Sequence, residues 1–80
     1  MTTSIKNENG IIETTYDSSN IASSSYDTTN YTLYIKFVKG GLRYKYINVS
    51  PYDYNNLQDS KSTGKAFIEF IKNKYKGERI

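Results

Sequence analysis

The stretch YTLYIKFVKGGLRYKYINVSPYD, residues 31–53, decides the fold. It opens with side chains that alternate between apolar and mostly polar, which is the period-two pattern of a strand with one buried face. In this first run, Tyr31, Leu33, Ile35 and Phe37 alternate with Thr32, Tyr34, Lys36 and Val38. Gly40-Gly41 then indicates a turn, and the alternation resumes in GLRYKY. The stretch therefore predicts a β-hairpin.

The length of the hairpin loop decides which side chains share a face. An even loop, either Lys39-Gly40 or Gly40-Gly41, places the apolar side chains of both strands on one side of the sheet. The opposite side then carries Tyr34, Lys36, Arg43 and Lys45. Only an odd loop with a bulge would exchange the two sets.

Two helices are predicted after the hairpin. Ser50 can cap the first, Pro51 fits its first turn, and Asp53 favours its positive end. This helix should be short and end near Asp59. A second helix begins at Ser62-Thr63, because apolar residues then recur at helical spacing, at Phe67, Phe70, Ile71 and Tyr75.

The N-terminal third has weaker signals. Residues 1–10 are polar and aperiodic, which predicts a flexible arm. Residues 11–26 suggest one or two short edge strands with a turn at residues 17–20. We therefore predict one α+β domain over residues 11–80. Its antiparallel meander of three to four strands is followed by two α-helices, which pack on one face of the sheet.

Composition excludes several classes of function. The 80 residues include no cysteine and no histidine, so disulfides, the usual zinc sites and Ser-His or Cys-His nucleophile pairs are ruled out. The first ten residues do not resemble a secretion signal, and no apolar run approaches the roughly 20 residues that span a membrane. We expect a cytoplasmic, non-enzymatic protein with no metal, no cofactor and no membrane association.

Positive charge is concentrated in one part of the chain. Residues 1–30 carry one lysine and four acidic residues, a net charge of −3, whereas residues 31–80 carry ten cations and four acids, a net charge of +6. An anionic partner would explain this asymmetry. A codon bias toward Lys, Asn, Ile and Tyr is the alternative explanation.

The sequence resembles the KTSC domain, a small module found at the C-terminus of some lysyl-tRNA synthetases and alone in bacterial and phage proteins. The likeness covers roughly residues 18–75 and rests on SSNIASSSYD, TLYIKFVKGGLRYKYINVSPYDYNNL and SKSTGKAFIEFIKNKY in order. Its most telling pieces are Tyr44-Lys45-Tyr46, Val49-Ser50-Pro51 and Ser62–Phe67. The family usually has an aromatic residue where this chain has Ala66. The resemblance implies RNA binding only by analogy with the synthetase context.

Two groups of residues are candidate binding sites. The first is the sheet face with Tyr34, Lys36, Arg43 and Lys45, because cations beside an aromatic ring suit phosphates and bases. A solvated sheet face is the alternative. The second is the helix start at Ser62, Thr63, Gly64 and Lys65, where free N–H groups, hydroxyls and a lysine suit an anion. An ordinary helix cap also explains it, although Gly64 hints at a close approach.

Tyr44 and Tyr46 are expected in the core, with ligand contact as the alternative. Our main hypothesis is a small non-catalytic module that binds RNA or a phosphate-bearing nucleotide. The alternative is a phage-type counter-defence or regulatory protein, which binds a host protein or sequesters a nucleotide signal as a homo-oligomer.

Overall fold

The central hairpin has the parity that the sequence predicts. In the computed structural model, which describes residues 1–80, β4 (Thr32–Phe37) pairs antiparallel with β5 (Arg43–Tyr46). Ile35 lies opposite Tyr44, and Lys36 lies opposite Arg43. The loop is even but longer than two residues, because a short 3₁₀ turn, η1 (Lys39–Gly41), lies within it. The apolar and basic sets therefore lie on opposite faces, as predicted.

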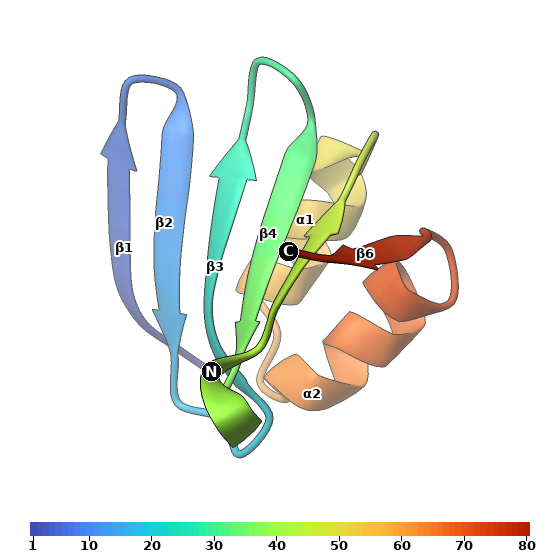
Figure 1. Cartoon of the computed structure of the whole chain (residues 1–80). Helices are drawn as coiled ribbons and strands as arrows, with labels where there is room; N and C mark the ends of the chain where they lie inside the picture. The colour runs from blue at the N-terminus through green and yellow to red at the C-terminus, as the bar shows by residue number, and fades with distance from the viewer.

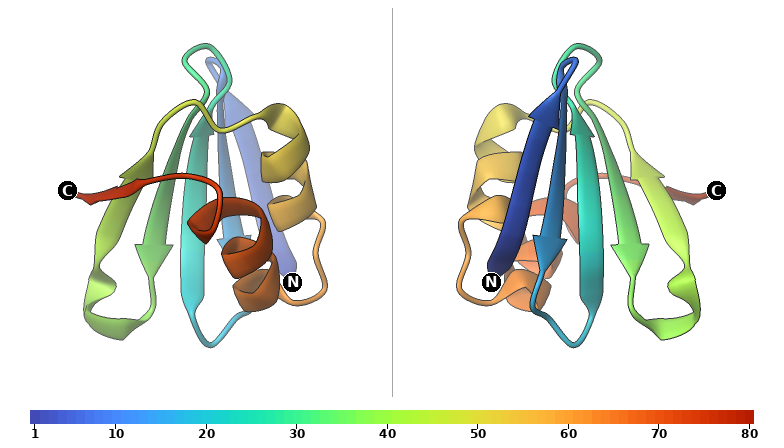
Figure 2. Two further views of the ribbon diagram at one scale, coloured as in Figure 1. Left: turned by 90° about the vertical axis from the view of Figure 1, so that its right-hand side faces the viewer. Right: turned by 90° about the vertical axis from the view of Figure 1, so that its left-hand side faces the viewer.

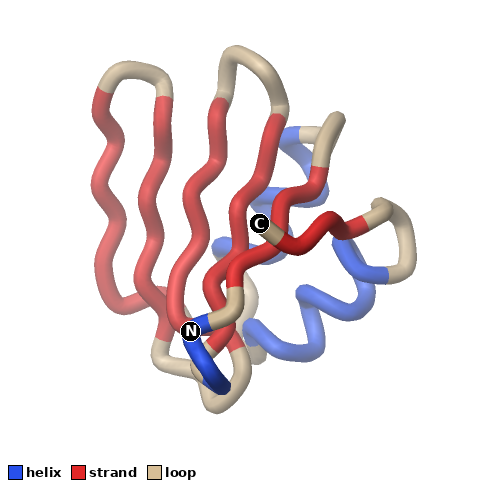
Figure 3. The backbone as a smooth tube through the Cα atoms, viewed as in Figure 1, coloured by secondary structure: helices blue, strands red, loops and turns tan.

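The sheet has six strands rather than the three to four that the sequence predicts. The strands follow chain order, β1 to β6, and every neighbouring pair is antiparallel (Figures 1 and 3). The N-terminal strands are β1 (Thr2–Glu8), β2 (Ile11–Tyr16) and β3 (Ile21–Asp27), and the last is β6 (Gly77–Arg79). The extra strands are the two edges, which carry no apolar alternation for a sequence pattern to reveal.

Residues 1–10, predicted as a flexible arm, instead contain strand β1. Its side chains are almost all exposed, so backbone pairing with β2 rather than apolar burial defines it. The N-terminal ammonium of Met1 also donates to the Thr63 hydroxyl at 2.8 Å, and the Thr2 hydroxyl donates to the Gln58 carbonyl. These contacts join the start of the chain to the helical layer.

The helices begin where the sequence predicts. In α1 (Pro51–Gln58), the Ser50 hydroxyl accepts from the Asp53 N–H at 3.2 Å, which is a standard N-cap. The second helix starts as α2 (Thr63–Ala66), without a side-chain cap from Ser62, and continues as a π-helical segment, η2 (Phe67–Lys72). The bond from the Asn73 N–H to the Ile68 carbonyl, 3.2 Å long, spans the five residues of a π turn.

Both helices cover the same face of the sheet, and the core lies between the layers (Figure 2). Tyrosines form much of this core. Tyr26 and Tyr54 stack with ring centroids 4.2 Å apart, and the Tyr26 hydroxyl donates to the Val49 carbonyl at 2.6 Å. Burial raises the pKa of Tyr26 to about 12, so its hydroxyl keeps the proton that it donates. No buried side-chain nitrogen or oxygen lacks a hydrogen-bond partner.

Candidate functional site

The outer face of the sheet brings the four predicted hairpin residues together. Tyr34 lies opposite Lys45, and Lys36 lies opposite Arg43, on the face that the helices leave open. Tyr34 is 38% exposed, which leaves part of the residue free to contact a ligand. Directly opposed side chains on one sheet face lie about 4.5–5.5 Å apart at Cβ. The four residues therefore form one compact group, which we call the basic face.

A shallow cavity of about 300 Å³ lies on the basic face. Tyr34, Lys36 and Arg43 line it, together with hydroxyl-bearing residues of β3 and Ile80 at the end of the chain. Ser23 and Ser25 face outward here, because Ser23 pairs with Lys36 and Ser25 pairs with Tyr34. The lining includes no acidic residue. Hydroxyl groups and cations are the groups that contact phosphate in nucleic-acid complexes.

The cations of the basic face differ in their partners. Lys45 has a weak contact with Glu78, whose carboxylate lies 4.0 Å from the ammonium. Lys36 and Arg43 lie opposite each other, and neither forms an ion pair with an acidic residue. Like charges in directly opposed positions destabilise a sheet. An anion bound between Lys36 and Arg43 would relieve that repulsion.

The helix-start candidate, Ser62 to Lys65, lies against the β2–β3 turn. Residues 17–20 of the turn and residues 61–65 line a polar cavity of about 300 Å³. Thr63 is buried, and its hydroxyl already accepts from the ammonium of Met1. A Cβ on Gly64 would lie 2.9 Å from the Asn20 amide nitrogen. The close approach expected at Gly64 is therefore to Asn20, while Ser62 and Lys65 stay exposed.

The most buried acidic residue has a structural role. The Asp53 carboxylate accepts from the Tyr75 hydroxyl at 2.6 Å and forms an ion pair with Lys74 at 2.9 Å. Burial alone would raise the pKa of Asp53, but the hydrogen bonds from Tyr75, Lys74 and Ser50 outweigh it, and the pKa lies below its usual value. This cluster fixes the start of α1 to the segment after η2. No group of three potential metal ligands occurs.

The largest cavity lies on the inner face, and sequence reasoning did not assign it a function. It measures about 440 Å³ and lies between the hairpin and the second helix. Tyr46 is buried and Tyr44 half-buried, in agreement with the expectation that both are core residues, and both also line this cavity. The sequence signal was the cluster of aromatic residues at inward positions, which core packing explains equally well.

Comparison with known proteins agrees with this fold. The model of the KTSC domain family matches residues 17–75. The chain belongs to the KTSC family. The matched segment begins at the turn before β3 and ends after η2, so strands β1, β2 and β6 lie outside it. Both candidate sites predicted from the sequence lie within the KTSC segment.

A solved KTSC structure supports the assignment. The crystal structure of the KTSC domain protein YPO2434 from Yersinia pestis is 31% identical, with a TM-score of 0.79, and the match covers 88% of this chain and 97% of that one. No curated protein matches the sequence. Where the family usually has an aromatic residue, this KTSC domain has Ala66, which is the last residue of α2 and is buried in the core. No helix has the length and apolar run needed to cross a membrane.

Proposed function

We propose that this KTSC domain is a non-catalytic module whose basic face binds RNA or a phosphate-bearing nucleotide. The observation that carries the proposal is the opposed pair Lys36 and Arg43, which no carboxylate neutralises, beside the partly exposed ring of Tyr34. The cations would hold phosphate, and the ring would stack on a base. Lys45 contributes less, because Glu78 lies near it.

A charge-reversal experiment tests this proposal. Lys36→Glu combined with Arg43→Glu replaces one pair of opposed like charges with another, so the cross-strand repulsion is retained and stability should change little. Binding of a fluorescein-labelled 12-nucleotide oligouridylate is measured by fluorescence anisotropy over a range of salt concentrations. The double variant should lose detectable binding. Lys6→Glu combined with Lys76→Glu, which changes the net charge equally outside the basic face, should keep most of it.

Phosphate contacts and base stacking differ in how binding depends on salt concentration. Each phosphate contact removed by neutralising a single cation should reduce the slope of log K against log salt by about 0.7. Tyr34→Ala should weaken binding by about 1–3 kcal/mol with an unchanged salt slope, since stacking releases no counterions. Absorbance at 260 nm and mass spectrometry of the purified protein would detect a co-purified nucleotide. If the double charge-reversal variant binds as tightly as the parent, the basic face is only a solvated surface.

A further inference from the structure

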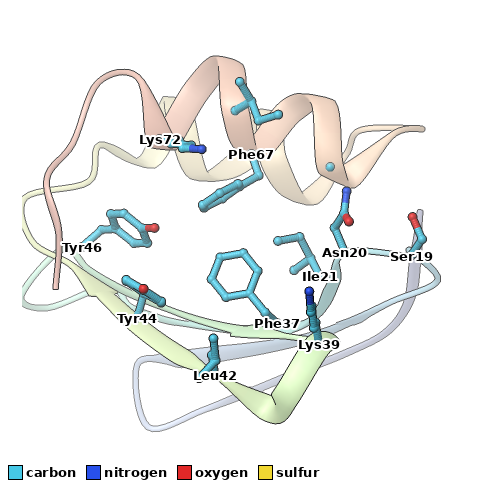
Figure 4. A pocket seen from close by; sticks show the side chains of 12 residues that line it. Ser19, Asn20, Ile21, Phe37, Lys39, Leu42, Tyr44, Tyr46, Phe67 and Lys72 are labelled. Carbon is cyan, nitrogen blue, oxygen red and sulfur yellow. The ribbon is translucent and has the colours of Figure 1, made fainter. Parts of the chain in front are cut away.

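The inner-face cavity is a cleft between two layers rather than a gap in the core. Its floor is formed by the hairpin, through Phe37 and Tyr44, and its opposite wall by Phe67 of η2 (Figure 4). Its volume of about 440 Å³ lies within the range of roughly 300–1,000 Å³ that small-molecule sites occupy. Leu42 and Ile68 line the cleft and are 36% and 49% exposed, so the cleft is open to solvent.

Three edge-to-face aromatic pairs connect the walls of this cleft. Phe37 meets Tyr44 edge to face, with centroids 5.6 Å apart and planes at 89°. Phe37 meets Phe67 at 5.4 Å and 83°, and Tyr46 meets Phe67 at 5.8 Å and 71°. Edge-to-face pairs of this kind stabilise the observed ring positions. The cleft therefore presents preformed aromatic surfaces, which suit a flat apolar ligand.

The only charged side chains that line the cleft are two lysines. Lys39 comes from the hairpin loop and Lys72 from the end of η2, so the two cations belong to opposite walls (Figure 4). Neither lysine makes an ion pair, and no acidic residue lines the cleft. Asn20 adds an amide that can donate hydrogen bonds. The charge of the lining is thus entirely positive.

The wall that carries Phe67, Ile68 and Lys72 is itself unusual. These three residues belong to the π-helical segment η2. Such segments are rare and are found often at functional sites. The rare backbone form and the unpaired lysine therefore occur together on the same wall of the cleft.

From these observations we propose that the cleft between the β4–β5 hairpin and η2 is a second binding site, which takes a small planar aromatic anion. The ring system packs beside the rings of Phe37, Tyr44 and Phe67, which contact one another, and Lys39 and Lys72 attract the anionic group from opposite sides of the cleft (Figure 4). This site is on the opposite face of the sheet from Lys36 and Arg43, so it does not rest on the proposed RNA binding. Charge reversal on either face tests one proposal without affecting the other.

The test uses two fluorescent dyes with the same aromatic skeleton. 1-Anilinonaphthalene-8-sulfonate carries an anionic group, and N-phenyl-1-naphthylamine does not. The folded protein should bind the sulfonate dye at least 5-fold more tightly than the uncharged dye. Lys39→Glu combined with Lys72→Glu should weaken binding of the sulfonate dye at least 10-fold and leave the uncharged dye within 2-fold. Lys6→Glu combined with Lys76→Glu is the matched control and should change neither.

Two further measurements locate the dye and narrow the class of ligand. In two-dimensional ¹H–¹⁵N NMR spectra, the sulfonate dye should shift the amide signals of Asn20, Lys39 and Ile68 while the spectrum stays that of a folded protein. Shifts confined to the outer face, or equal affinity for the two dyes, would overturn the proposal. Displacement of the dye by adenosine monophosphate indicates a nucleotide ligand, and displacement by indole-3-acetate an aromatic carboxylate. Displacement by neither at millimolar concentration would also overturn it.

Both lysines are exposed, so the double variant is expected to fold. Its melting curve, followed by circular dichroism, should match that of the parent protein. If it does not fold, the single variants Lys39→Gln and Lys72→Gln replace it, and each should weaken binding of the sulfonate dye about 3-fold. Unchanged affinity in both single variants would refute the role of the lysines.

Discussion

Adjacent substitutions in β4 should have opposite consequences for folding. Ile35 is 1% exposed and lies between Ser24 of β3 and Tyr44 of β5, whereas Lys36 faces solvent. Replacing Ile35 by alanine removes buried carbon atoms and should cost about 3 kcal/mol, within the 2–5 kcal/mol typical of such truncations. An 80-residue domain has a free energy of unfolding of about 4–12 kcal/mol, so the variant should still fold. Its melting temperature should fall by about 12–24 °C.

Urea denaturation followed by circular dichroism measures this difference directly. Lys36→Ala should change the free energy of unfolding by no more than about 0.5 kcal/mol. Lys36→Asp should do no harm either, because it replaces a like-charge pair with an attractive pair opposite Arg43. Ile35→Asp should prevent folding, because it buries a carboxylate without a partner. Equal losses from Ile35→Ala and Lys36→Ala would refute the division of the hairpin into an inner and an outer face.

Two further substitutions test contacts between the C-terminal segment and the core. Gly77→Ala should destabilise the domain by about 1–3 kcal/mol in urea denaturation, since the added Cβ would lie 2.6 Å from the buried Tyr46 ring. A loss below about 0.5 kcal/mol would show that the Tyr46 ring moves aside without cost. Asp53→Asn should cost about 1–3 kcal/mol at pH 7. Because folding lowers the pKa of Asp53, its carboxylate stabilises the protein above about pH 4. The difference in free energy of unfolding between the parent protein and the variant should therefore shrink as the pH falls below that value. A difference that stays constant from pH 7 to pH 2.5 would contradict this.

The parts of the fold that the sequence predicted depend on local chemistry. The hairpin follows from the alternation in residues 31–46 and from the two glycines, both of which have positive φ in the loop. The start of α1 follows from Ser50 and Pro51, whose effects extend over a few residues only. Such signals can be found in a single sequence because the interacting groups are neighbours along the chain.

The parts that the sequence did not reveal depend on contacts between distant segments. Strand β1 is held by backbone pairing with β2 and by contacts of Met1 and Thr2 with the helical layer. Strand β6 has only three residues, all exposed, and pairs with β5. Neither strand buries an apolar face, so neither has a periodic pattern. Edge strands of this kind become visible only when their partners are placed in space.

The candidate sites also differ in how far the sequence predicts them, because one depends on neighbouring residues and the other on distant segments. Hairpin parity was enough to group Tyr34, Lys36, Arg43 and Lys45 on one face, and the structure groups them there. The cleft was beyond sequence reasoning, because Lys39 and Lys72 approach the same cavity from different layers. Nothing in either local sequence distinguishes these two lysines from solvated surface residues.

Strand β5 joins the two proposals, because its four residues alternate between the two sites. Arg43 and Lys45 contribute to the basic face, and Tyr44 and Tyr46 line the cleft. The even loop between β4 and β5 fixes this assignment, since a shift of one residue would turn the cations inward and the tyrosines outward. The alternation of cation and tyrosine in this strand is therefore compatible with core packing and ligand recognition at the same time. On this strand the cations lie on the open face of the sheet, whereas Tyr44 and Tyr46 pack toward the core and also line the cleft.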